Sequence, residues 1–195
     1  MAAKLSPQDL FSLEEYARTR SDFRVRVLAH KKHRRLGLGD HLTLHFEDSL
    51  TMQYQIQEML RIERIFEPEG IQAELDAYNP LIPDGSNWKA TLLIEYSDVA
   101  ERQQALARLM GIEEQIWVQC GGHERVHAVA DEDMERSTDD KTSAVHFLRF
   151  ELLPEMVDSL RVGETLTVGA SHANYLLDGL QVPGLVRESL LADLA

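Results

Sequence analysis

The eight histidines of the chain are the side chains best suited to hold a metal ion. Two pairs, His41 with His45 and His123 with His127, are spaced four residues apart. On a helix this spacing would place both rings on one face, but both pairs fall in segments with strand patterns. Because a strand rises about 3.3 Å per residue, each pair would be about 13 Å apart, too far for one ion. Neither pair alone is expected to form a metal site.

A metal site would therefore need a histidine from one strand and further ligands that the fold brings to it. The candidate ligands are Glu47 and the histidines His41, His45, His146 and His172. Imidazole and carboxylate groups suit divalent ions such as zinc or iron. The alternative, which we favour, is that these histidines are exposed or satisfied by hydrogen bonds.

A second group of polar side chains lies in the segment 57–64, QEMLRIER. Arg61 and Arg64 are about one helical turn apart, so their guanidinium groups could hold a carboxylate or a phosphate bidentately. With Glu58, and with His172 and Tyr175 of the later segment HANY, they form our candidate site for an anion or a partner protein. The competing and simpler hypothesis is that both arginines pair with carboxylates of their own helix.

A different function class, a metal-dependent or acid-base enzyme, would assemble its site from Glu58, Arg61, His45 and His172. The sequence identifies no catalytic residue, cofactor or substrate. We therefore favour a non-catalytic accessory or binding protein.

The single cysteine, Cys120, excludes an internal disulfide and favours a reducing compartment. It lies in a predicted strand with apolar neighbours, which is typical of a small buried cysteine, and the alternative is a reactive thiol. The first residues, MAAKLSPQDL, lack the pattern of a signal peptide, and no apolar run approaches the length of a membrane span. We expect a cytoplasmic protein that does not bind membranes.

The formal net charge of −13 argues against nucleic acid as a partner. The basic run KKHRR at 31–35 is more typical of a solvated helix end. With 44% hydrophobic and 27% charged residues, the composition is that of an ordinary globular protein.

The polar groups of residues 41–57 lie in two segments in which polar and apolar side chains alternate. The pattern predicts a β-hairpin with a loop at 48–50, in which Leu44 faces Tyr54 in the core and His45 faces Gln53 on a polar face. A helix is then expected from QEMLRIER onward.

The N-terminal segment 12–35 predicts a long helix with a capping box at Ser12 and a stop at the following glycines. Its apolar stripe also contains Arg20, Arg24 and Lys31. Either the helix bends and these side chains reach outward, or the arginines point inward and meet a carboxylate such as Glu58. The sequence does not decide whether Arg20 and Arg24 are buried.

The remaining pattern alternates strands and short helices, with an acidic segment at 131–142 that predicts an exposed, mobile loop. Strands are expected near 88–96, 115–120, 123–130, 143–152 and 164–171, and helices near 69–78, 99–110, 154–162 and 185–194. This order predicts one α+β domain over 1–195, with a mainly antiparallel sheet of about six or seven strands.

Four segments, QEMLRIER, ELDAYNPLIP, SAVHFLRF and HANY, resemble an uncharacterised bacterial family catalogued as a domain of unknown function. The resemblance covers nearly the whole chain. Genes of this family often lie beside those for a rubrerythrin-like di-iron protein and an iron-sulfur oxidoreductase. The resemblance therefore implies a link to a redox or peroxide-defence system and a partner among those iron proteins. It assigns no role to single residues.

Overall fold

The computed structural model describes residues 4–134, 136–138 and 140–195. Within them the chain forms two antiparallel sheets and six α-helices, which confirms the α+β class. The strands number nine and are divided between two sheets, whereas we expected about six or seven in one. None of the helices in the described part of the chain combines the length and apolar character needed to span a bilayer.

The first sheet has five strands in the order β1-β2-β3-β7-β6. They are β1 (Arg35–Leu38), β2 (Leu42–Glu47), β3 (Asn87–Ile94), β7 (Val145–Glu151) and β6 (Val129–Ala130). The second sheet has the order β5-β4-β8-β9. Its strands are β5 (Val126–His127), β4 (Ile116–Cys120), β8 (Leu166–His172) and β9 (Tyr175–Gln181).

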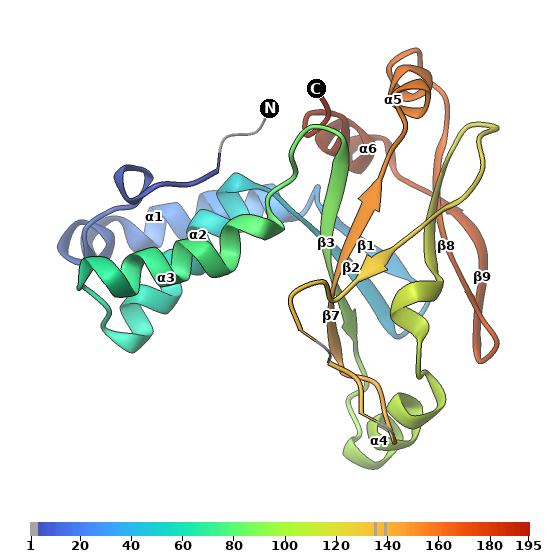
Figure 1. Ribbon diagram of the computed structural model, residues 1–195, viewed down its shortest axis with the longest axis horizontal. Coiled ribbons are helices and arrows are strands. Elements are labelled where there is room, and N and C mark those ends of the chain that lie inside the picture. The colour runs from blue at the N-terminus through green and yellow to red at the C-terminus, as the bar shows by residue number, and fades with distance from the viewer. Residues whose placement is uncertain (1–3, 135, 139) are drawn as a thin grey trace.

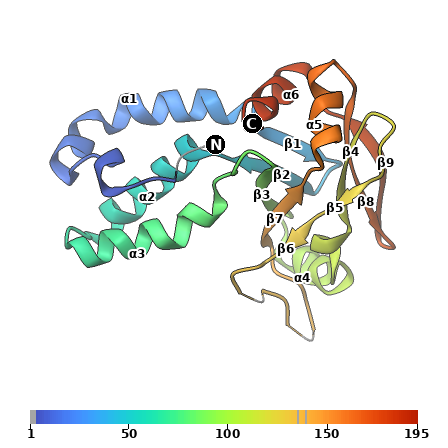
Figure 2. The ribbon, with the colours of Figure 1, turned by 45° about the horizontal axis from the view of Figure 1, so that its top comes forward.

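The α-helices divide into two groups. On one side of the five-stranded sheet lie α1 (Leu13–Lys31), α2 (Ser49–Glu63) and α3 (Pro68–Tyr78), with the four-stranded sheet on the other side (Figures 1 and 2). The others are α4 (Val99–Arg108), α5 (Pro154–Arg161) and α6 (Gly184–Leu191), and the short 3-10 turns are η1 (Pro7–Asp9), η2 (Asn79–Leu81) and η3 (Ile112–Gln115).

The main core is shared by the two sheets and the later helices, because alternate residues of each strand point inward. In the five-stranded sheet the aligned residues Phe46, Ala90 and Leu148 are buried in this core. The neighbouring aligned set, His45, Thr91 and Phe147, must then face the side of α2 and α3. The sheet therefore has one fully apolar face and one mixed face.

The three N-terminal helices have two small apolar clusters of their own. Tyr16, Phe23 and Val27 of α1 form one of them. The other joins Ile56 and Leu60 of α2 to Leu75 of α3. Both are separate from the main core, so little apolar packing ties these helices to the sheets.

The predicted second strand of the hairpin was wrong, because residues 49–63 form α2. The Asp48 side chain accepts the Thr51 N–H at 2.9 Å and caps this helix. Met52, Ile56 and Leu60 recur every four residues and are at most 4% exposed. This four-residue spacing fits a helix as well as the alternation of residues 52, 54 and 56 fits a strand. Because Tyr54 lies in α2, Leu44 does not face it across a hairpin. Instead β2 pairs with β1 and β3.

The N-terminal helix ends at Lys31 rather than near 35, since Arg35–Leu38 forms β1. Leu36 and Leu38 are buried in the main core, and this burial favours a strand over a continued helix. Gly37 lies within β1 and does not stop the helix, whereas Gly39 takes a positive φ of 75° in the turn that follows.

Two further expectations need correction. The segment after HANY forms β9, a strand that we did not predict. The acidic segment 131–142 is not simply exposed, because Thr142 is 1% exposed and Arg136 binds Asp131 and Asp133. Glu135 and Asp139 of that segment lie outside the described residues.

Candidate functional site

Glu58 is held in a network between α1 and α2. Its Oε1 accepts from the Tyr16 hydroxyl at 2.6 Å and from Arg20 Nε at 2.7 Å. Its Oε2 accepts from Arg20 at 2.9 Å and from Arg61 at 3.1 Å. The expected pairing of Glu58 with a basic group is thus confirmed for Arg20 and Arg61, while Arg24 is exposed.

This network determines the charge of Glu58. The Arg20 guanidinium, helped by Tyr16 and Arg61, lowers the pKa of the carboxyl to about 2 despite partial burial. Arg61 is therefore already engaged by a fixed carboxylate. Arg64 is exposed at the end of α2, with a positive φ of 57°.

His172 and Tyr175, the other two candidate residues, lie on the second sheet at the turn between β8 and β9. The Tyr175 hydroxyl donates to Leu38 O at 2.5 Å, and a ring nitrogen of His172 lies 3.0 Å from Met110 O. In Figure 1 this sheet and α2 are at opposite sides of the molecule. The five candidate residues thus form two separate groups, and their proposed ligand-binding role stays a prediction.

The candidate metal-ligating histidines are also dispersed. The His41 ring stacks on Tyr96 with 3.8 Å between centroids. His45 lies beside the helices on the mixed face of the first sheet, whereas His146 is fully buried. His172 bonds at the far turn, so these four rings do not assemble into one site.

The stretch 123–127, His-Glu-Arg-Val-His, has the spacing of the zinc-binding HExxH motif. That motif holds zinc only when a helix brings both rings to one face. Here the segment is a loop that enters β5. His123 lies 2.8 Å from Ser159 Oγ and His127 lies 3.4 Å from Glu114 O, so the two rings have different neighbours. This arrangement is not that of a HExxH zinc site.

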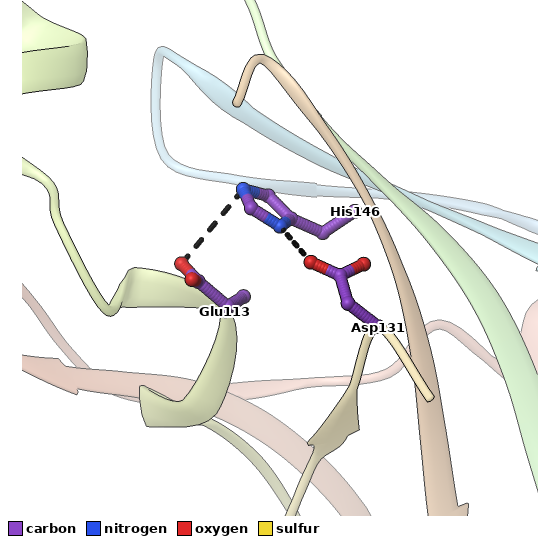
Figure 3. Close-up of side chains that lie close together, drawn as sticks. All are labelled: Glu113, Asp131 and His146. Atoms are coloured by element: carbon purple, nitrogen blue, oxygen red, sulfur yellow. Dashed lines mark hydrogen bonds and ion pairs between the residues drawn. The ribbon is translucent and has the colours of Figure 1, made fainter. Parts of the chain in front are cut away.

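A buried cluster joins Glu113, Asp131 and His146 (Figure 3). Glu113 comes from η3, Asp131 directly follows β6, and His146 is in β7. Nδ1 of His146 is 2.6 Å from Asp131 Oδ2, and Nε2 is 3.7 Å from Glu113 Oε2. The two carboxylates thus face different nitrogens of one imidazole ring.

Hydroxyl groups complete this cluster. Thr142 Oγ1 lies 2.8 Å from Nε2 of His146 and donates to Glu113 Oε2 at 3.1 Å. Ser137 Oγ donates to the other Glu113 oxygen at 3.0 Å. A cavity of about 260 Å³ beside the cluster is lined by Glu113, Asp131, Arg136 and Ser137. A small ion or water can thus approach the buried group.

A cleft runs between α2, α3 and the mixed face of the first sheet. Two adjoining cavities, of about 330 and 420 Å³, share Tyr78, Leu81 and Phe147 in their walls. The first also contains Lys31, and the second also contains Lys89. These volumes lie within the usual range for small-molecule sites.

Burial changes the pKa of two groups in the cleft. It lowers the pKa of the Lys89 ammonium group, because desolvation penalises the charged form. Burial likewise lowers the pKa of His45, which favours the neutral ring. The Glu47 carboxylate, also in the cleft wall, accepts from Thr51 at 2.6 Å and from Thr91 at 2.7 Å. Lys89 thus places in the cleft a positive charge that burial disfavours.

Sequence reasoning named His146 of the buried cluster and His45 and Glu47 of the cleft as candidate metal ligands, but it missed the residues that surround them. Lys89 and Thr91 alternate with the buried Trp88, Ala90 and Leu92, so the strand pattern already contained a signal for the mixed face. No comparable local spacing connects Glu113 to Asp131 and His146.

Two comparisons with known proteins found matches, and neither match has an established function. A family model described as "Protein of unknown function (DUF3501)" matches residues 4–194. A crystal structure of a protein of unknown function from Burkholderia pseudomallei K96243 is 50% identical in sequence. It superposes with a TM-score of 0.95 over 99% of this chain and 100% of the other. No curated protein matches the sequence.

Proposed function

The chain belongs to the DUF3501 family of proteins of unknown function, and within it we propose that this protein is a non-catalytic binding protein for a small organic anion. The site is the cleft between α2, α3 and the first sheet. The observation that carries the proposal is the presence of two lysines, Lys31 and Lys89, in the walls of an otherwise largely apolar cleft.

The two ammonium groups can reach a ligand, although Lys31 Nζ also lies over the Tyr54 ring, 5.9 Å from its centroid. In the part of the chain that the structure describes, neither forms an ion pair, and two carboxylates that act on Lys89, those of Glu132 and Glu151, both bind Arg149 at 2.6 to 2.8 Å. Because burial already disfavours the charge on Lys89, an anion beside it would be attracted more strongly than in open water. A carboxylate or sulfonate group meets this need.

The apolar side chains of the cleft favour a ligand whose uncharged part is apolar. Tyr78, Leu81 and Phe147 lie between the two lysines and are shared by both cavities. An aromatic or short aliphatic body would bury its surface there, at about 25 cal/mol per Å² of apolar area. We therefore expect an amphipathic acid rather than inorganic phosphate.

The carboxylates of the cleft support binding without chemistry. Glu47 is saturated by two hydroxyl donors, and Glu132 is bound bidentately by Arg149. The other two carboxylates in the walls are also engaged, Asp133 by Arg136 and Asp76 by Gln72. A general base would need a carboxylate free of such partners.

A fluorescence titration tests this proposal with two probes of similar shape. Anilinonaphthalene sulfonate carries a negative charge, whereas N-phenyl-1-naphthylamine is neutral. We expect saturable binding of the sulfonate, about tenfold weaker in Lys89→Gln and in Lys31→Gln, since a charge-assisted contact is worth about 1.5 kcal/mol or more. The affinity for the neutral probe should change less than about twofold in the same variants.

Lys32→Gln is the matched control, because Lys32 is the exposed neighbour of Lys31. If the sulfonate binds the lysine variants as tightly as the parent, or if the purified protein turns over a substrate, the proposal is wrong.

A cytoplasmic role beside an iron-sulfur or di-iron redox protein belongs to the same proposal, and the family resemblance is what supports it. Size-exclusion chromatography with a purified rubrerythrin-like protein tests this part separately. Independent elution of the two proteins would remove the partner and leave the cleft proposal intact.

A further inference from the structure

We infer that His146 Nε2 and Glu113 bind a divalent ion of the first transition row, with Asp131 orienting the imidazole ring. The site lies where η3, the end of β6 and the start of β7 meet (Figure 3). It is distinct from the cleft and does not depend on the proposed binding function.

The hydrogen bonds of the His146 imidazole are the first observation that supports this inference. Asp131 Oδ2, 2.6 Å from Nδ1, accepts a hydrogen bond from the N–H of that nitrogen. A neutral ring then has a lone pair on Nε2. Yet Nε2 is 3.0 Å from the carbonyl oxygen of Ser143, which also can only accept. The Thr142 hydroxyl, 2.8 Å from Nε2, can donate to only one acceptor, whereas a cation beside Nε2, either an additional proton or a metal ion, satisfies Nε2 and the carbonyl oxygen together.

The separations of the acceptor atoms fit a coordination sphere. Nε2 of His146 lies 2.8 Å from Thr142 Oγ1 and 3.7 Å from Glu113 Oε2. Thr142 Oγ1 and Glu113 Oε2 are 3.1 Å apart. Ligands at about 2.1 Å from a metal are about 3.0 Å apart in an octahedron and about 3.4 Å apart in a tetrahedron. The observed separations span both values.

The hydrogen bonds of Asp131 are those expected of a carboxylate that orients a metal-bound histidine. A histidine that ligates a metal through one nitrogen usually donates its other N–H to a carboxylate. Asp131 accepts that N–H, and its other oxygen accepts from Phe147 N at 2.9 Å and from Arg136 at 3.3 Å. Asp131 is therefore fixed and already saturated, so it orients the ring and is not a ligand.

Glu113 needs a cationic partner, which either an imidazolium or a divalent ion beside Nε2 of His146 would supply. Glu113 is 8% exposed, and its oxygens receive hydrogen bonds only from the hydroxyl groups of Ser137 and Thr142 within the described residues. The guanidinium of Arg136, which lines the same cavity, binds Asp131 instead. A divalent ion would neutralise Glu113 and also engage the Ser143 carbonyl. The adjoining cavity of about 260 Å³ leaves room for water ligands, which an imidazolium would not require.

The ligand types limit the choice of metal. One imidazole nitrogen with carboxylate, carbonyl and hydroxyl oxygens suits Mn²⁺, Fe²⁺ or Zn²⁺, whereas thiolate-seeking Cu⁺ and all-oxygen Ca²⁺ or Mg²⁺ fit less well. Zn²⁺ and Mn²⁺ are therefore the probes, and Mg²⁺ is the comparison ion.

Isothermal titration calorimetry of the chelator-treated full chain with each of these ions is the direct test. We expect one Zn²⁺ and one Mn²⁺ per chain, and no saturable Mg²⁺ binding over the same range. Glu113→Gln and His146→Gln should abolish binding of both transition metals. Asp131→Asn should weaken it about 10- to 100-fold, as loss of a second-shell partner does.

Two exposed neighbours provide matched controls. Glu114→Gln and His127→Gln should leave the affinities unchanged, because Glu114 and His127 lie outside the ligand set. If Zn²⁺ binding is lost in His127→Gln but kept in Glu113→Gln, the metal binds at the HExxH stretch and the inference is overturned.

Because His146 is fully buried, its substitution could unfold the protein, so a second measurement uses the parent alone. Bound Mn²⁺ broadens NMR signals of nearby amides, and we expect substoichiometric Mn²⁺ to broaden those of residues 113, 131 and 142–146 first. Absence of broadening there, with both His146 ring nitrogens observed protonated, would show that a proton occupies the site and would overturn the inference.

Discussion

Arg34, just before β1, and Asp193, in the turn after α6, form a buried ion pair with 2.5 Å between Nη2 and Oδ2. Arg34 is 2% exposed and also donates to the carbonyl oxygens of Phe46 and Glu47, at 3.0 and 2.9 Å. One guanidinium thus connects β2 with the end of α6. The pairing explains why a charged side chain is stable at the edge of the core.

Replacing this arginine should strongly destabilise the fold. Arg34→Ala leaves the Asp193 carboxylate and two carbonyl groups without donors, so we expect the free energy of unfolding to fall by about 3 to 5 kcal/mol. Urea denaturation of the parent and the variant measures this change in the free energy of unfolding. The control, Arg35→Ala, removes an exposed side chain whose contact with Glu95 is 3.8 Å long, and should cost under about 1 kcal/mol. Equal effects of the two substitutions would contradict the role given to Arg34.

Acid should weaken the contact between α1 and α2 through Glu58. Its pKa is about 2 in the folded protein, chiefly because of Arg20, against an ordinary value of 4.5. The stabilisation is therefore fully present above pH 4.5 and is lost as the pH falls towards 2. At pH 7 we expect Glu58→Gln to be less stable than the parent by about 1 to 2 kcal/mol, after allowance for solvent screening. Denaturation curves at several pH values should show this difference shrinking below pH 4.5.

Gly169 in β8 should not tolerate a side chain. A Cβ at this position would press on the Trp117 indole and lie 2.5 Å from the carbonyl oxygen of Leu177. We expect Gly169→Ala to cost about 1 to 3 kcal/mol and to alter the near-ultraviolet circular dichroism of Trp117. Gly184→Ala is the control, because no atom lies within 4 Å of the place that its methyl group would take, and it should be neutral or slightly stabilising.

Cys120 should be inert in the folded state. It is fully buried, and burial raises the pKa of its thiol to about 11. At pH 8 we expect a disulfide reagent such as dithionitrobenzoate to label it only after unfolding in urea. Rapid labelling of the native protein would instead support the reactive-thiol alternative.

The elements with strong local signals could be predicted from the sequence. Pro68 and Pro154 begin helices, and Asp98 caps α4 by accepting the Glu101 N–H at 2.8 Å. The segment 49–63 could not be assigned by period alone, because both a strand and a helix fit its apolar residues. Its glutamine, methionine and leucine residues, which favour helices, were the available counter-signal.

The candidate sites depend on contacts distant in sequence. Asp131 reaches His146 because Ala130 pairs with Leu148 between β6 and β7, and Glu113 reaches both from η3. No spacing in one segment encodes such a pairing. The Glu58 network was predictable in part, because Arg20 lies on the buried side of an otherwise regular helical pattern.

The separate apolar clusters of α1, α2 and α3 have a consequence for hydrogen exchange. Helices with their own small clusters can open without disrupting the sheets, so their amides should exchange with deuterium faster than those of β3 and β7. The cleft lies at this boundary, and its occupancy would be coupled to that local opening. A bound anion would then appear first as slower exchange in α2 and α3, before any change in the sheet.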